Sequence, residues 1–206
     1  GLGASSEVLA GPAEKFVEQA MSWIKASLTE HERVIFDGNG YSEEWAAEAQ
    51  KRGLPNYPTT PDALPCIVRP ENIAFFAKYG VLNESEVRAR YVSYAEQYSK
   101  LINIEANTMS YMVRHMYLPA LIDYSKDIAT GVATKLELGL KARAEKQLVE
   151  RLTGGIDAIF DTVDALEKAN AAAGTIVDPE QQNYAYRDEV LARMEHLRNL
   201  VDTMEQ

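Results

Sequence analysis

The sequence predicts an all-α protein in which an irregular N-terminal segment with short helices packs on a bundle of three or four long antiparallel helices. Three observations support this class. Apolar residues recur at helical spacing over two runs that are much longer than an average helix. Five of the eight prolines fall between residues 53 and 70, where they exclude a long helix or a central strand. Hydrophobic residues make up 46% of the 206 positions, enough to bury a core.

The first predicted helix begins at Pro12, because the fixed φ and missing N–H of proline suit the first helical position. It continues to about residue 28 with one apolar stripe, which consists of Phe16, Val17, Ala20, Trp23, Ile24 and Leu28. The small residues at 2–11 predict a loop before it. Because the chain opens within a loop and without an initiator methionine, we expect a piece of a longer protein or a processed N-terminus.

Short elements connect this helix to the bundle. Alternating glycines at residues 37–40 predict a turn, after which Ser42 can cap a short helix that ends near Arg52. The connector at residues 53–70 is rich in proline but carries scattered apolar residues, so we expect it to be ordered rather than a flexible linker. Within it, Pro61 can start a single helical turn.

A further short helix is predicted from Pro70 to about Tyr79, where Gly80 ends it. The character of the chain then changes from short elements to long helices. We therefore divide it into residues 1–80 and residues 81–206. The second part forms the long-helix bundle.

The first long helix starts with strong local signals. Asn83 followed by Glu86 is close to a capping box. The pairs Glu84–Arg88 and Glu86–Arg90 have the favourable i,i+4 order. The apolar stripe that follows consists of Val87, Tyr91, Tyr94, Tyr98, Leu101, Ile102, Met109, Met112, Val113 and Met116. An unbroken helix of this length spans about 50 Å at about 1.5 Å per residue, so it requires antiparallel partners.

Pro119 is expected to kink this run rather than end it, because apolar residues continue the pattern to Val132. A second long helix is predicted from about Leu140 to Ala172. It contains Gly154 and Gly155, which indicate either a close helix–helix contact or a bend.

The last helix is predicted to restart at Asp178 and Pro179, a good cap followed by a good first residue. Its apolar positions are Val190, Met194, Leu197, Leu200, Val201 and Met204. We find no internal repeat in the chain.

Charge and cysteine content exclude several classes of protein. The chain has 21 basic and 31 acidic residues, a net charge of −10, which disfavours nucleic acid and anionic lipid as partners. Cys66 is the only cysteine, so neither an intrachain disulfide nor a cysteine-based zinc site can form. No apolar run reaches the length of about 20 residues that crosses a bilayer. We expect a cytoplasmic protein without membrane contact.

Few residues suggest chemistry. The turn at residues 37–40 begins like a calcium loop, but the later ligand positions do not match, so we interpret it as a structural turn. The histidines 31, 115 and 196 lie far apart and form no metal-ligand spacing. Glu105 lies within an apolar stripe, and we expect it to be partly buried with a partner such as Arg114, His115 or a tyrosine hydroxyl. We assign no catalytic, cofactor-binding or metal-binding residue.

Tyrosines and methionines on the first long helix are also spaced for packing. They are Tyr91, Tyr94, Tyr98, Met109, Met112 and Met116. We interpret this set as core filling and not as a cofactor box. No nucleophile–base–acid set and no glycine-rich nucleotide motif is present.

Several blocks, taken together and in order, carry a resemblance to a known family. They are residues 2–6, 10–12, 33–45, 52–54, 59–65, 72–73, 79–81, 84–91, 103–109, 117–120 and 186–190, together with Met194. These blocks resemble the C-terminal third of type III glutamine synthetases. The resemblance is specific between residues 33 and 120 and loose from 125 to 180.

The resemblance implies a parent enzyme that joins glutamate and ammonia, using ATP and a divalent metal, Mg, through a γ-glutamyl phosphate. In that family the catalytic carboxylates and arginines lie upstream of the part that matches residue 1, so it implies no catalytic residue here. It also implies the rest of the synthetase chain and neighbouring subunits as partners, in a homo-oligomer of two hexameric rings. The expected role is a non-catalytic domain that contributes to assembly or covers the catalytic core. The alternatives are a free-standing helical module that binds other proteins and, resting on little more than Glu105, a bundle that senses a ligand.

Overall fold

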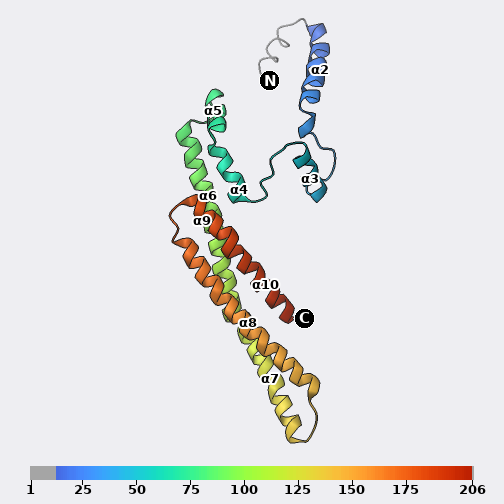
Figure 1. Cartoon of the computed structure of the whole chain (residues 1–206), viewed down its shortest axis with the longest axis vertical. Coiled ribbons are helices and arrows are strands. Elements are labelled where there is room, and N and C mark those ends of the chain that lie inside the picture. The colour runs from blue at the N-terminus through green and yellow to red at the C-terminus, as the bar shows by residue number, and fades with distance from the viewer. Residues whose placement is uncertain (1–12, 206) are drawn as a thin grey trace. The chain divides into compact units, whose positions relative to one another are not determined.

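The computed structural model describes residues 13–205, and every regular element within this range is a helix. The predicted all-α class is therefore confirmed. The chain divides into two compact units, residues 1–57 and residues 58–206. The elements of both units are labelled in Figure 1. The predicted loop at residues 2–11 and the predicted helix start at Pro12 lie outside the described range.

The first unit contains α2 (Ala13–Glu30), the short 3₁₀ helix η1 (Glu32–Val34) and α3 (Glu43–Lys51). Ser42 caps α3 as predicted, because its hydroxyl accepts a hydrogen bond of 3.3 Å from the backbone N–H of Trp45. The ring of Trp45 stacks on Phe36 with centroids 4.2 Å apart. Arg52 lies 5.6 Å from the same indole and donates a 2.7 Å hydrogen bond to the carbonyl of Ile35. Aromatic stacking and this arginine thus hold the segment before α3 against the helix.

The connector is ordered, as the sequence predicts. It forms α4 (Thr60–Ala63), the 3₁₀ helix η2 (Leu64–Val68) and α5 (Pro70–Lys78). Pro61 occupies an early position in α4 and is buried. Gly80 follows α5 with φ of 64°, a conformation that favours glycine.

By packing, the connector belongs with the bundle. The elements η2 and α5 pack on the first long helix, and α4 packs on the helix that begins at Pro179. The boundary between the compact units accordingly follows Tyr57. The segment 58–80 is grouped with the long helices rather than with the N-terminal segment.

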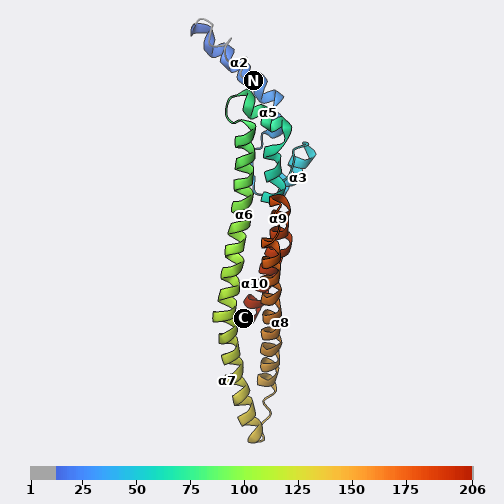
Figure 2. The ribbon, with the colours of Figure 1, turned by 90° about the vertical axis from the view of Figure 1, so that its left-hand side faces the viewer.

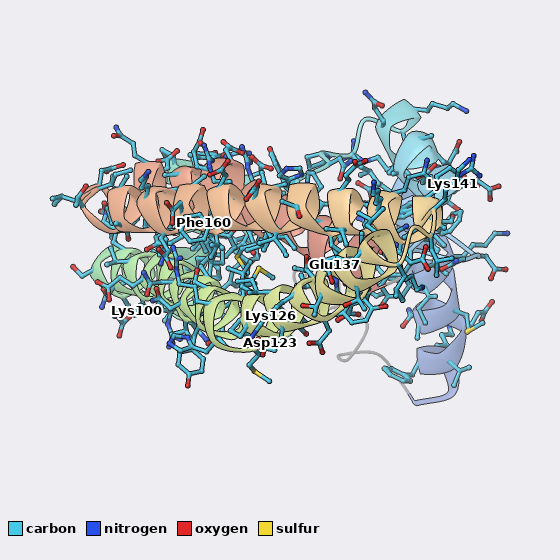
Figure 3. The ribbon with its side chains drawn as sticks, turned by 90° about the horizontal axis from the view of Figure 1, so that it is seen from below. Lys100, Asp123, Lys126, Glu137, Lys141 and Phe160 are labelled. Carbon is cyan, nitrogen blue, oxygen red and sulfur yellow. The ribbon has the colours of Figure 1, made fainter. Side chains whose placement is uncertain are left out.

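The bundle is a long helical hairpin with a third helical run against it (Figures 1 and 2). One arm comprises α6 (Glu84–Met112), the π turn η3 (Val113–Tyr117) and α7 (Leu118–Glu137). The other arm is α8 (Arg143–Gly174), which packs antiparallel to α6 and α7. The third run comprises α9 (Pro179–Ala185), the π turn η4 (Tyr186–Leu191) and α10 (Ala192–Glu205). In Figure 3 the two arms lie side by side, with Lys126 on one and Phe160 on the other.

The core runs along the interface between the two arms and the third run. Its best-buried members come from all of them: Val87, Ala95, Ala106, Val113, Ile159, Val163, Leu166, Val190 and Leu197. Most are β-branched or small residues, which allow the helices to approach closely. The capping box of Asn83 and Glu86 forms as predicted, and Arg88 pairs with Glu84 at 2.8 Å. The predicted pair Glu86–Arg90 is wrong, because the Glu86 carboxylate accepts the backbone N–H of Asn83 instead.

The run continues past Pro119, as predicted. The backbone widens into the π turn η3 immediately before the proline, and α7 then begins with Pro119 in its first turn. Because proline lacks an N–H and clashes with the carbonyl one turn earlier, the helix must adjust at this point. A π turn is one recognised adjustment.

The two glycines of α8 differ in their surroundings. A Cβ at Gly155 would overlap the thioether of Met204 on α10, whereas a Cβ at Gly154 would meet open space. Helix α8 continues through both. Of the two predicted alternatives, Gly155 therefore marks a close helix–helix contact.

Candidate functional site

A ladder of polar side chains runs along the inner face of α6. Ser99, Asn103 and Asn107 are spaced four residues apart, so they lie on one helix face. Their partners lie on α8, α9 and η4. The hydrogen bonds are Ser99 Oγ to Asn183 Oδ1 (2.7 Å), Asn103 Nδ2 to the Tyr186 hydroxyl (3.0 Å) and to Asn170 Oδ1 (3.3 Å), and Asn170 Nδ2 to Asn107 Oδ1 (3.0 Å).

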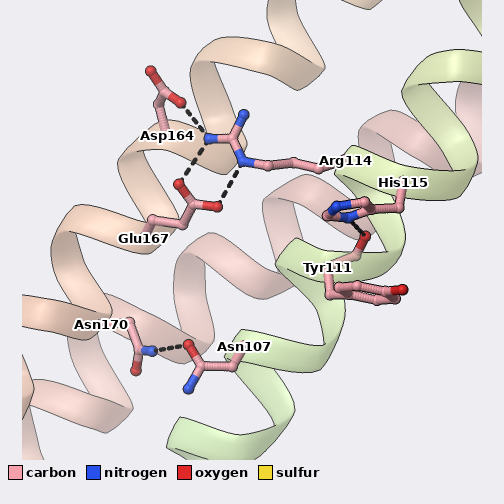
Figure 4. A network of polar contacts seen from close by, with 7 residues as sticks. All are labelled: Asn107, Tyr111, Arg114, His115, Asp164, Glu167 and Asn170. Carbon is pink, nitrogen blue, oxygen red and sulfur yellow. Dashed lines mark hydrogen bonds and ion pairs between the residues drawn. The ribbon is translucent and has the colours of Figure 1, made fainter.

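The ladder determines how α6 aligns with the other arms. Asn170 and Asn183 are 6% and 2% exposed. A buried amide without a hydrogen-bond partner destabilises the folded state. Figure 4 shows Asn170 reaching Asn107 across the interface. A slip of α8 by one turn would leave these amides unpaired inside the bundle. The ladder therefore selects one register of the helical arms.

An arginine cluster continues the same face of α6 at the π turn. Arg114 donates through Nε and Nη2 to both carboxylate oxygens of Glu167, each at 2.7 Å, and through Nη2 to Asp164 at 2.5 Å (Figure 4). Its guanidinium lies 5.5 Å from the ring of Phe160. The hydrogen bonds from Arg114 lower the pKa of the Glu167 carboxyl and raise the pKa of the guanidinium above its usual value. Arg114 thus binds two carboxylates of α8, and the cluster ties the π turn η3 to that helix.

The structure corrects the prediction that Glu105 is partly buried and paired. Its side chain is exposed, and it makes no hydrogen bond or ion pair with any residue between 13 and 205. Arg114, one of the predicted partners, is bound to Glu167 and Asp164 instead. The predicted partial burial of Glu105 is wrong because the inner face of α6 is carried by Ile102 and Ala106, on the positions beside it.

The core-filling interpretation is also wrong in part. Tyr91, Tyr98, Met109 and Met112 are half-buried, but Tyr94 is 46% and Met116 57% exposed. Leu101, assigned to the same stripe, is 55% exposed. The reason is that small residues such as Ala95 and Ser99 occupy the innermost positions of α6. Tyr98 and Met109 pack against the core from its edge, whereas Tyr94, Leu101 and Met116 face outward.

Of the three histidines, His115 makes local contacts within its own helical run. His115 Nδ1 lies 2.9 Å from the carbonyl oxygen of Tyr111, and the two rings stack with centroids 4.3 Å apart (Figure 4). His31 and His196 are exposed, the former before η1 and the latter on α10. Within the described part of the chain, no group of three or more metal-ligating side chains could hold a metal ion.

The turn at residues 37–40 is stabilised by its own polar groups. Asn39 Oδ1 accepts the backbone N–H of Tyr41 at 3.1 Å, and the Ser42 hydroxyl donates to the carbonyl of Asn39 at 3.0 Å. These contacts direct the asparagine and serine oxygens toward the backbone rather than toward a common point. They are the pattern of a structural Asx turn.

A second arginine site joins segments that lie far apart in the sequence. Arg187, on the π turn η4, donates to Asp62 Oδ1 at 2.8 Å and to the Thr59 hydroxyl at 3.2 Å. It also donates to Asp188 and lies 4.8 Å from the ring of Tyr184. The Thr59 hydroxyl and then Arg187 lower the pKa of Asp62, and Arg187 lowers the pKa of Asp188.

Both segments at this site carry blocks of the family resemblance, residues 59–65 and 186–190. Sequence reasoning missed the contact, because a spacing of 125 residues gives no local signal. The polar ladder, in contrast, had a signal: polar residues at four-residue spacing inside a long helix.

No helix in the described residues is long and apolar enough to span a membrane.

A comparison with protein families decides the classification. The family described as "Glutamine synthetase C-terminal domain" matches residues 19–136, more than half of the chain. The chain belongs to this family. As a glutamine synthetase C-terminal domain, it matches the family from within α2 to the last turn of α7. The resemblance inferred from the sequence blocks is confirmed.

Individual relatives agree with the family. A glutamine synthetase from Butyrivibrio fibrisolvens is 33% identical over 98% of this chain and 29% of its own length. A type-3 glutamine synthetase from Dictyostelium discoideum is 41% identical over 53% of the chain and 15% of its own length. A glutamine synthetase from Bacteroides fragilis (strain YCH46) is 24% identical over 88% of the chain and 26% of its own length. This glutamine synthetase C-terminal domain thus spans less than a third of these relatives.

Proposed function

We propose that the chain is the non-catalytic C-terminal part of a glutamine synthetase, an ATP-dependent glutamate–ammonia ligase of nitrogen metabolism, and that it contributes to assembly or covers the catalytic core. The family match and the relatives named above support this role. Its partners in this proposal are the rest of the synthetase chain and neighbouring subunits of a homo-oligomer.

The apolar face of α2 is the observation that carries the proposal. Phe16, Trp23 and Ile24 are 39%, 38% and 42% exposed although they lie on one face of the helix. Val17, Met21 and Leu28 widen the same face and are more than half exposed. Within α2, no side chain from residue 15 onward is buried. An exposed apolar stripe of this size is typical of a docking surface.

Further exposed apolar residues follow α2 in the same unit. Val34 and Ile35 are 55% and 46% exposed, and Tyr41 is fully exposed. Docking of this chain on a catalytic core, as proposed here, implies an apolar surface near residues 2–45. Within residues 13–45 the exposed apolar side chains support that expectation.

We propose that ATP and Mg bind to other parts of the synthetase. Magnesium prefers carboxylate ligands in an octahedral arrangement. The carboxylates that cluster in the described part of the chain, Asp164 with Glu167 and Asp62 with Asp188, each surround an arginine. They do not fit such a site, and we assign no reaction step to this chain.

We also propose a cytoplasmic location. Cys66 is a free, half-buried thiol, which suits a reducing compartment.

The test is a binding titration between this chain and the Butyrivibrio fibrisolvens glutamine synthetase from which the matching part has been deleted. Saturable binding is expected. Replacing Trp23→Ser and Ile24→Ser together should weaken it by at least about tenfold, since buried aromatic and aliphatic anchors dominate interface energies. The matched control is Gln19→Ser with Lys25→Ser, which changes the polar face of the same helix and should leave binding unchanged. No binding, or equal loss in both double variants, would refute the docking role.

A further inference from the structure

A groove runs beside α10, on the side that faces α6. It has a volume of about 510 Å³ and lies between α6, the π turn η3 and α10. Its floor consists of the buried side chains Val113, Leu197 and Val201. A volume of this size lies within the range of about 300–1,000 Å³ that is usual for small-molecule sites.

Methionines form the walls of the groove. Met109 and Met112 line it from α6, and Met194 lines it from α10. These are three of the six methionines in the chain. Because methionine side chains are flexible and polarizable, such walls adapt to an apolar body of varied shape.

The charges at the groove favour a cation. Arg198 and Asp202 line it but pair with each other along α10 at 3.5 Å, so their charges compensate. The Glu105 carboxylate also lines the groove and has neither a hydrogen bond nor an ion pair among residues 13–205. The uncompensated charge beside the apolar floor is therefore negative.

We propose that this groove binds a small amphipathic cation, an alkyl chain that carries an ammonium group. The alkyl chain lies against Met109, Met112 and Met194, and the ammonium group lies beside Glu105. The site is independent of the docking role of α2, because it lies wholly within the helical bundle.

The test uses NMR of the 206-residue chain labelled with ¹³C at the methionine methyl groups, titrated with octylammonium. We expect saturable shifts of Met109, Met112 and Met194. Met21 lies in the other compact unit and should not shift. Met116 and Met204 line a neighbouring pocket and should shift less. Absence of saturable shifts, or shifts centred on Met116 and Met204, would overturn the proposal.

Two further comparisons isolate the charge. Replacing Glu105→Gln should raise the dissociation constant for octylammonium by about three- to fivefold, the effect of one exposed ion pair. The control Glu137→Gln removes an exposed carboxylate on α7, outside the groove, and should leave the constant unchanged (Figure 3). Octanoate, with a similar alkyl chain and the opposite charge, should bind more weakly. An unchanged constant for the Glu105 variant, or tighter binding of octanoate, would contradict the assignment of a cation.

Discussion

The guanidinium of Arg187 donates a 2.8 Å hydrogen bond to the carboxylate of Asp62, which lies 125 residues earlier in the chain. The same guanidinium reaches the Thr59 hydroxyl, and Thr59 in turn donates to Asp62. The contact attaches the short helix α4 to the π turn η4. One arginine thus connects the beginning of the second compact unit to its last helical run.

Replacing Arg187→Met should release this attachment. We expect faster amide hydrogen exchange in residues 59–64, with little change in α6 and α8, because the contact holds a local segment and not the core. Hydrogen-exchange mass spectrometry measures both regions at once. The control Arg193→Met removes a contact to Glu189 one helical turn away and should leave residues 59–64 protected. Unchanged exchange in the Arg187 variant would show that the connector is held by other contacts.

Asn170→Ala should destabilise the bundle by about 1–3 kcal/mol, since it removes a buried partner of Asn103 and Asn107. The free energy of unfolding in urea gives the value. Asn199→Ala serves as the control, because Asn199 lies exposed on α10 and its loss should change little. Equal stability of the two variants would argue that water replaces the ladder at no cost.

The arginine cluster predicts a dependence on pH. Arg114 lowers the pKa of Glu167 in the folded chain, so the unfolded state binds more protons in acid. The stabilisation is then complete above the unfolded pKa of about 4.3 and is lost as the pH falls through the folded pKa. Replacing Arg114→Met should cost about 1 kcal/mol at about pH 7, a value reduced by partial exposure of the cluster.

The difference in unfolding free energy between this variant and the unchanged chain should shrink as the pH is lowered below about 4. Lys100→Met is the control, because it removes an exposed pair with Glu96 on the same helix and should matter little at any pH. A difference that stays constant from neutral to acid pH would contradict an electrostatic role of Glu167.

The adjacent glycines of α8 provide a matched pair. Gly154→Ala should raise the free energy of unfolding by about 0.5–1 kcal/mol, because alanine favours a helix and its Cβ meets no atom there. Gly155→Ala should raise the free energy of unfolding by less, because the Met204 side chain must move to make room for the new Cβ. Thermal or urea unfolding of both variants and of the unchanged chain measures the two differences in unfolding free energy. An equal gain at both positions would show that the helices do not meet closely at Gly155.

Elements with strong local signals could be predicted from the sequence. Asn83 with Glu86, Ser42, Pro70 and Gly80 each act within a few residues, and the helix ends at these positions follow from local chemistry. The continuation of the helix past Pro119 could be predicted for another reason, because apolar residues carry the helical pattern on to Val132.

The inner face of α6 could be predicted only in part. Val87, Ile102 and Val113 of the predicted stripe are buried, but so are Ala95, Ser99 and Ala106, which the stripe did not include. Close approach of helices selects small residues there, and small residues give a weak periodic signal. The contact between Arg187 and Asp62 and that between Gly155 and Met204 depend on tertiary packing, which spacing along the chain does not encode.

The most direct test of the non-catalytic role is an assay of glutamine formation with this chain alone, supplied with glutamate, ammonia, ATP and magnesium. We predict no glutamine above a protein-free blank. The catalytic groups in this proposal lie in the rest of the synthetase. Sustained ATP-dependent turnover by the isolated 206-residue chain would contradict the account.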